Sequence, residues 1–280
     1  MSFPFTVPLT AKEVITPTST QRCPLGTRGA TADGRIYHYA KAGETALTKG
    51  LLCTSLVPAN SWSNATYAYL STPFLTAIGS TSVPVTSRTL QFSSTGGATL
   101  TIAKDYFKDG WVWVSGTSTA AGQQMQIKTN TVASSGSSGS SAEVSVTFAD
   151  GHYLAEVVST ADWFSMVKNE YDGVIIATTT TAPTAKFLGV PNCKVTASYY
   201  FWIQTWGPCP VKAEAAAISG NKLIVSSTSV AGTIAGITAS TDQEGTLHLA
   251  VPLGQTISSS AQGTALIASH NILVHLTIDP

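Results

Sequence analysis

The stretch Tyr199–Trp206, which reads Tyr-Tyr-Phe-Trp-Ile-Gln-Thr-Trp, decides the fold class of this chain. Aromatic and β-branched side chains fit a pleated, partly buried surface, and they make up most of this stretch. An apolar run without strict alternation is typical of a strand that is buried on both faces. Val174-Ile175-Ile176 has the same character, so both segments predict central β-strands.

Shorter strand candidates surround these two segments and are separated by turn signals. Asp33-Gly34 predicts a tight turn before a strand at Arg35–Tyr39, and Gly96-Gly97 predicts another hairpin. Ala142–Phe148 places Val144, Val146 and Phe148 on one face by strict alternation. We therefore predict an all-β fold, a β-sandwich or a partly closed barrel of short strands, with at most one or two short helices.

Composition supports this fold class and excludes some classes of function. The chain has 280 residues, of which 32 are Ser, 40 are Thr and only 11% are charged. Thr favours extended backbone, while Ser and Gly favour turns. The 15 basic residues equal the 15 acidic ones, which argues against binding of nucleic acid through its phosphates. A surface so poor in charge is expected either to pack against other protein or to belong to a soluble β domain of unusual composition.

The N-terminal segment is expected to be an extended arm over residues 1–24, since its prolines disfavour helix. Along the arm Phe3, Phe5, Val7 and Leu9 alternate with other residues, so one edge is apolar. This edge can pack on its own domain or reach over a neighbouring subunit. Residues 25–212 are expected to form the main β domain, and residues 213–280 a C-terminal β region packed on it or a small subdomain.

A short helix is expected after Ser159. Ser159-Thr160-Ala161-Asp162 is a possible helix cap, followed by apolar residues from Trp163 to Val167. The N-terminus resembles no secretory signal, and no apolar run has the length of a membrane span. We therefore expect synthesis in a cytoplasm and no membrane partner.

No segment predicts an active site, a metal site or a cofactor site. The cysteines (Cys23, Cys53, Cys193, Cys209) are far apart in the sequence and form no C-x-x-C pair, so they are expected to be buried small residues. The carboxylates that could serve a hydrolase are Asp105, Asp109 and Asp150, the last of which lies beside His152 in the sequence, but no catalytic motif surrounds them. We expect a protein that is not an enzyme.

Aromatic side chains are the candidates for a binding role. Trp111 and Trp113 alternate with valines and must share one sheet face, which is either core or a platform on which sugar rings stack. Tyr199, Trp202 and Trp206 are further candidates for glycan stacking.

Several segments from residue 25 onward resemble virion structural proteins of tailed bacteriophages: the two quoted next, and also Gly110–Gly116, Ile127–Asn130 and Asn169–Val174. The first is Leu25–Gly43, in which a Thr-x-Asp-Gly-Arg turn leads into an aromatic strand and an Ala-x-Ala-Gly turn. The second is Tyr200–Pro208, followed by a C-terminal strand that ends in Leu276-Thr277-Ile278-Asp279-Pro280. The resemblance implies a decoration or cement protein that binds the outer surface of an assembled capsid as an oligomer. It carries over no catalytic residues. With a capsid as partner, the apolar edge of the arm is the candidate contact, formed by Phe3, Phe5, Val7 and Leu9.

The sequence thus predicts a virion protein whose partners are the major capsid protein and further copies of itself, with a trimer preferred to a dimer. Three alternatives stay open: a tail, neck or fibre component, a projecting domain that binds host glycans, and a hydrolase.

Overall fold

The computed structural model describes residues 6–55, 82–94, 101–115, 119–134, 142–159, 163–178, 185–213, 223–226, 230–236, 253–257 and 271–278. The chain divides into two compact units. One unit, here called the barrel unit, combines residues 1–57 with residues 170–280, and the other, the inserted unit, comprises residues 58–169. Each unit is described by itself.

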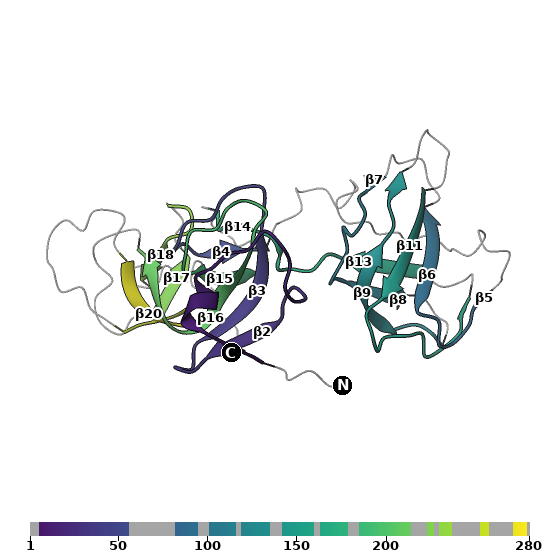
Figure 1. Cartoon of the computed structure of the whole chain (residues 1–280), viewed down its shortest axis with the longest axis horizontal. Coiled ribbons are helices and arrows are strands. Elements are labelled where there is room, and N and C mark those ends of the chain that lie inside the picture. Colours follow the sequence, from purple (N-terminus) through teal and green to yellow (C-terminus); the bar gives the residue numbers. More distant parts are fainter. Residues whose placement is uncertain are drawn as a thin grey trace, which may run out of the picture. The chain divides into compact units, whose positions relative to one another are not determined.

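The barrel unit is built on a ring of hydrogen-bonded strands (Figure 1). Each strand pairs with the next, and the last pairs back with the first, so five strands close on themselves. In ring order they are β3 (Ile36–Ala42), β14 (Asp172–Ile176), β4 (Cys53–Thr54), β15 (Phe187–Pro191) and β16 (Tyr200–Lys212). Closure leaves these strands no unpaired edge inside the ring.

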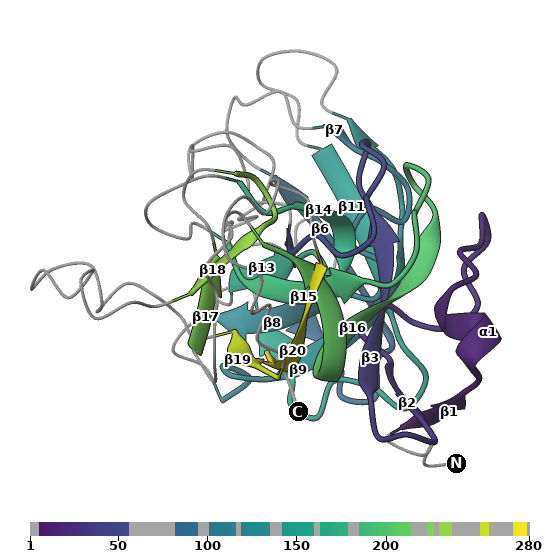
Figure 2. The ribbon, with the colours of Figure 1, turned by 90° about the vertical axis from the view of Figure 1, so that its left-hand side faces the viewer.

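Further strands extend the sheet on both sides of the ring. Next to β3 lie β2 (Arg28–Thr31) and β1 (Val7–Leu9), with the short helix α1 (Ala11–Val14) beside them (Figure 2). Next to β16 the order is β20 (Asn271–Thr277), β19 (Gly254–Thr256), β17 (Leu223–Ser226) and β18 (Ile234–Gly236). The C-terminal region expected from residue 213 onward therefore continues the sheet of the barrel.

Aromatic residues from β3 and β16 dominate the core of this unit. Tyr37, Tyr39 and Phe201 are fully buried, and the ring of Trp202 lies 5.0 Å from that of Tyr39. Gly29 makes room for this packing, because a Cβ atom there would lie 2.5 Å from Leu9 and 2.9 Å from Trp202. The expectation that Tyr199–Trp206 is a strand buried on both faces is confirmed, since positions 201–205 are all buried.

The inserted unit is an antiparallel sheet of five strands with two short strand pairs. The sheet order is β13 (Trp163–Val167), β8 (Trp111–Ser115), β9 (Gln124–Asn130), β11 (Ala142–Phe148) and β6 (Thr89–Ser94). The short pairs are β10 (Ala133–Ser134) with β7 (Thr101–Ile102) and β12 (Val158–Ser159) with β5 (Ser82–Val83). Its core takes alternate residues from the sheet, among them Val112, Val114, Met125, Ile127, Val144, Val146 and Phe148.

The predicted all-β class is confirmed, and the barrel is closed. In the part of the chain that the structure describes, α1 is a single helical turn. Thr10 caps it reciprocally with Glu13: the backbone N–H of Glu13 donates to the Thr10 hydroxyl at 3.3 Å, and the Glu13 carboxylate accepts from the Thr10 backbone N–H at 2.8 Å. These hydrogen bonds from Thr10 lower the pKa of the Glu13 carboxyl.

The helix expected after Ser159 is wrong. Trp163–Val167 instead forms β13, which pairs along its whole length with Trp111–Ser115 of β8. Ser159 ends β12, and residues 160–162 lie outside the described residues. A short apolar run has no periodicity that distinguishes a strand from a helix. Here the segment is a strand because it pairs with the edge of β8.

The unit boundaries also differ from the expected ones at residues 24 and 212. β14 pairs with both β3 and β4, so segments on either side of the inserted unit belong to one barrel. Both units are made of short strands and turns of similar composition, which is why no change along the sequence marks the boundary.

The two deeply buried thiols provide a test of the barrel. Cys53 and Cys209 are free and fully buried, and burial raises the pKa of the Cys209 thiol to about 12 and the pKa of Cys53 as well. Because the thiolate is the reactive form, we expect N-ethylmaleimide at pH 8 to leave both unmodified in the folded chain. Cys23 and Cys193, which are half-buried, serve as the internal comparison.

Peptide mass spectrometry before and after addition of guanidinium measures this labelling. All four cysteines should be modified in guanidinium. Modification of Cys53 in the folded chain as fast as that of Cys23 would contradict the barrel core described above.

Candidate functional site

The longest strand, β16, changes partner halfway along its length. Residues 200–206 pair with β3, whereas residues 206–212 pair with β20. The register shifts between Gln204 and Trp206, and Gly207 follows with a positive φ of 88° that favours glycine. This switch determines which side chains of β16 face inward and which face outward.

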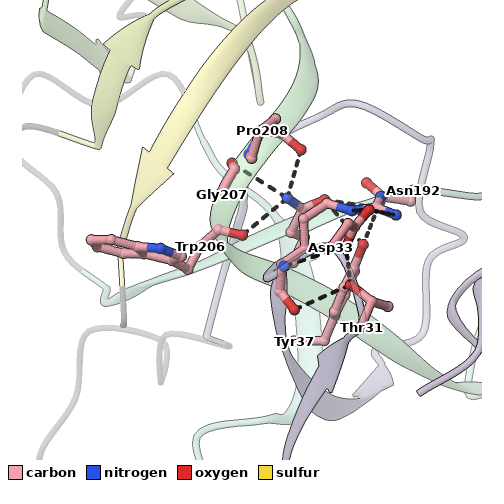
Figure 3. A network of polar contacts seen from close by, with 9 residues as sticks. Thr31, Asp33, Tyr37, Asn192, Trp206, Gly207 and Pro208 are labelled. Atoms are coloured by element: carbon pink, nitrogen blue, oxygen red, sulfur yellow. Dashed lines mark hydrogen bonds and ion pairs between the residues drawn. The ribbon is translucent and has the colours of Figure 1, made fainter. Parts of the chain in front are cut away.

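A buried amide holds the switch in place (Figure 3). The Gln204 side chain is fully buried, and its Nε2 donates to the carbonyl oxygens of Pro208 at 2.9 Å and Trp206 at 3.1 Å. Its Oε1 accepts from Asn192 Nδ2 at 2.8 Å and from the Tyr37 hydroxyl at 3.4 Å. Because a buried amide without partners is costly, this set of bonds specifies one arrangement of the strand.

The Asp33-Gly34-Arg35 turn lies beside the same network. The Asp33 carboxylate accepts from Arg35 Nε and Nη2, each at 2.8 Å, and from the Thr31 hydroxyl. The Thr31 hydrogen bond and the Arg35 partner lower the pKa of the Asp33 carboxyl. The Arg35 guanidinium in turn lies 5.8 Å from the centre of the Tyr37 ring. The segments Leu25–Gly43 and Tyr200–Pro208 therefore meet at Tyr37, where they stabilise the fold.

The outward face of the strand switch is the candidate functional site. Beyond the switch, Trp206, Pro208 and Pro210 point outward, whereas Gly207, Cys209 and Val211 are buried. Figure 3 shows the Trp206 indole pointing away from the polar network. On β20 the alternate residues Leu273 and His275 face the same way, and Trp206 meets His275 edge to face at 5.3 Å.

Pro210, Leu273 and Ile257 form an exposed apolar row across the strands, while the exposed polar residues Gln255 and Thr277 pair with His275 and Trp206 on the same face. Pro210 pairs with Leu273, and the backbone N–H of Ile257 donates to the Leu273 carbonyl at 3.0 Å, so Ile257 continues the row beyond β19. Leu273 is 39% exposed and Ile257 is 48% exposed. We call Trp206, Pro208, Pro210, Ile257, Leu273 and His275 the β16–β20 face. Lys212 is the nearest outward cation on β16, at its end.

The prolines stiffen this face without interrupting the ladder between β16 and β20. Lys212 donates its backbone N–H away from β20, to the Gly50 carbonyl at 2.8 Å. Pro208 and Pro210 lie two and four residues before Lys212, and alternate residues of a strand direct their backbone N–H groups to the same edge. The N–H groups that the prolines lack would therefore also point away from β20. The result is a rigid, charge-poor apolar surface.

The predicted arm lies on its own unit over the residues described. β1 pairs in parallel with β2, Leu9 is buried beside Gly29, and Val7 is half-buried against the core of the barrel unit. Thr18 forms a bridge with Tyr200. Leu9 is therefore not exposed for contact with a capsid, which corrects that part of the arm prediction. Phe3 and Phe5 lie outside the described residues.

The structure separates the predicted aromatic candidates into three places. Trp202 is 9% exposed and packs in the barrel core, and Tyr199 is half-buried against the same core. Trp206 lies on the β16–β20 face. Trp111 and Trp113 are half-buried on the outer face of the inserted unit, because the intervening Val112 and Val114 fill its core.

The carboxylates considered for catalysis have structural contacts. Asp105 accepts a hydrogen bond from the Thr129 hydroxyl, and Asp150 forms an ion pair with Lys128 at 3.0 Å. Asp105 and Asp109 both have a φ of 61°, which is typical of tight turns. Among the described residues, no group of three His, Cys, Asp or Glu side chains is placed to hold a metal ion. No helix within the described ranges has the length and apolarity needed to span a membrane.

Comparison of the chain with protein-family models, curated proteins and solved structures finds no match. The β16–β20 face was missed at the level of sequence, although its signal is present. The alternation of Trp206, Pro208, Pro210 and Lys212 with small or apolar residues marks one outward face, but the prolines conceal the strand.

The buried amide of Gln204 gives the first prediction for this site. Gln204→Leu removes the donor to two carbonyl groups and the acceptor for Asn192, so we expect a loss of roughly 2–4 kcal/mol in the free energy of unfolding. Urea denaturation followed by tryptophan fluorescence measures it. The matched control is Gln124→Leu at an exposed position of β9, expected to change stability by less than about 0.5 kcal/mol. Equal losses in the two variants would contradict the role of Gln204.

The phenol of Tyr37 gives a pH prediction. Burial raises the pKa of Tyr37 from 10.0 to about 12, so the neutral phenol is favoured in the folded state. The contribution of Tyr37 to stability is therefore present below pH 10 and is lost as the pH rises towards 12. We expect Tyr37→Phe to reduce the dependence of unfolding free energy on pH in this window, as measured by urea denaturation at a series of pH values. An unchanged slope would contradict this expectation.

Proposed function

We propose that this chain is a virion structural protein that binds the outer surface of an assembled phage capsid and stabilises it. The β16–β20 face is the observation that carries the proposal. It combines an exposed apolar row with rigid prolines and very little charge, which is typical of the centre of a protein–protein contact. The resemblance of Leu25–Gly43 and Tyr200–Pro208 to phage virion proteins supports the major capsid protein as the proposed partner.

The proposed contact gains free energy from burial of apolar surface and loses little conformational entropy of the side chains that form it. The pyrrolidine rings of Pro208 and Pro210 are already fixed, and Trp206 is held against His275. A preorganised surface of this kind binds without the entropy loss of flexible side chains. Many copies on one particle would then act together on capsid stability, although each contact is modest.

Self-association is the second part of the proposal. β1 and β18 are the end strands of the barrel sheet within the described residues, and an end strand can add a strand of a neighbouring subunit. A closed ring of three such heterologous contacts matches a threefold axis of a capsid lattice, which favours a trimer over a dimer.

A tail, neck or fibre component is the alternative within the same class, because it would present similar surfaces. The number of copies per particle discriminates between the two. Gel densitometry of purified virions of the encoding phage should give a copy number close to that of the major capsid protein. A copy number far below it would favour a place in the tail or neck.

A charge placed in the apolar row tests the proposed face. We expect Leu273→Lys to lower the occupancy of purified capsids by roughly tenfold or more, since the buried lysine has no partner in the contact. Ile15→Lys is the matched control, because Ile15 is 55% exposed in the same unit but lies next to α1. Circular dichroism confirms that both variants fold. Equal occupancy of the Leu273→Lys and Ile15→Lys variants would exclude the β16–β20 face as the binding surface.

A further inference from the structure

The outer face of the inserted sheet carries two tryptophans that its core does not use. Val112 and Val114 of β8 are 0% and 1% exposed and pack in the core. By the alternation of a strand, Trp111 and Trp113 must then project from the opposite face, where both are half-buried. Residues two apart on a strand are separated by roughly 7 Å, so the indoles form two neighbouring platforms along β8.

Amide side chains flank both indoles on the neighbouring strand. Trp111 pairs with Gln126 and Trp113 pairs with Gln124 across the ladder to β9. Directly opposite residues of an antiparallel pair lie on the same face. Among the described residues, neither indole N–H and neither of these two side-chain amides has a hydrogen-bond partner within the chain. Each glutamine thus presents two donors and an acceptor beside an aromatic surface.

The turn after β11 completes the outer face next to Trp111. The His152 ring meets the Trp111 indole edge to face at 6.0 Å. The backbone N–H of Gln126 donates to Nδ1 of His152 at 3.4 Å, so in the neutral imidazole the proton lies on Nε2, which is a donor. Lys128, on the same face of β9 as Gln124 and Gln126, is paired with Asp150 at 3.0 Å, so this pair adds no net charge to the face.

From these features we infer that the outer face of β8 and β9 binds a neutral oligosaccharide. The C–H groups of a pyranose face are weakly positive and stack on the negative face of an indole, while the hydroxyl groups need amide and imidazole partners at the rim. Two adjacent platforms on an open sheet suit consecutive sugar units of a chain. A small molecule would instead require an enclosing pocket. The balanced charges favour an uncharged ligand over a polyanion.

This inference goes beyond capsid binding and does not depend on it, since it concerns the other unit. It would give a virion protein an affinity for glycans at a cell surface. Trp206 also points outward, but on the barrel unit, and its outward neighbours on β16 are two prolines instead of a second tryptophan. It therefore serves as a control tryptophan for glycan binding.

Affinity electrophoresis of the full chain tests the proposal. Native gels containing amylose, xylan, mannan or laminarin supply neutral chains, and alginate supplies an acidic one. We expect retardation by at least one neutral polysaccharide and a weaker effect, or none, with alginate. Trp113→Ala should weaken the retardation at least about tenfold in apparent affinity, whereas Trp206→Ala should leave it unchanged.

Gln124→Ala provides a second variant that leaves both indoles in place. It should weaken binding without changing the thermal unfolding of the chain, because Gln124 is exposed. Retardation by none of the neutral polysaccharides, retardation by alginate alone, or full retardation of the Trp113→Ala variant would each overturn the inference.

Discussion

The closed barrel depends on a single strand that belongs both to the ring and to the strands that extend the sheet beyond it. β16 closes the ring through β3 and β15 with its first half, and carries β20 and the strands beyond with its second half. Such a strand must bend between its halves without leaving polar groups unpaired in the core. The Gln204 amide satisfies this constraint, because it bonds the carbonyl groups of the bend on one side and Asn192 and Tyr37 on the other. The outward direction of Trp206, Pro208 and Pro210 follows from it.

The fold class and several individual strands were predictable from local pattern. β11 has the bounds of the alternating segment Ala142–Phe148, and Gly34 has a φ of 84° in the predicted turn. Tyr199–Trp206 indicated a doubly buried strand because its apolar residues do not alternate. The projection of Trp111 and Trp113 from one face was also predictable, but the sequence alone does not state which face is the core.

The features that sequence did not reveal depend on contacts between distant residues. β13 was predicted as a helix because its pairing with β8 is not encoded in its own residues. Trp202 was grouped with exposed aromatics, yet Gly29 and Tyr39 receive it in the core. The β16–β20 face exists only when Pro210 and Leu273, far apart in the sequence, become cross-strand neighbours. The Gln204 network likewise joins residues from three strands or turns.

The pairing of β4 with β14 has a consequence for closure of the barrel. Thr54 and Ile175 are direct partners, yet the whole inserted unit lies between them in the chain. Bringing the ends of a long flexible segment together costs entropy that grows with its length. Closing the barrel therefore carries an entropic cost that a ring of strands adjacent in the sequence would not carry.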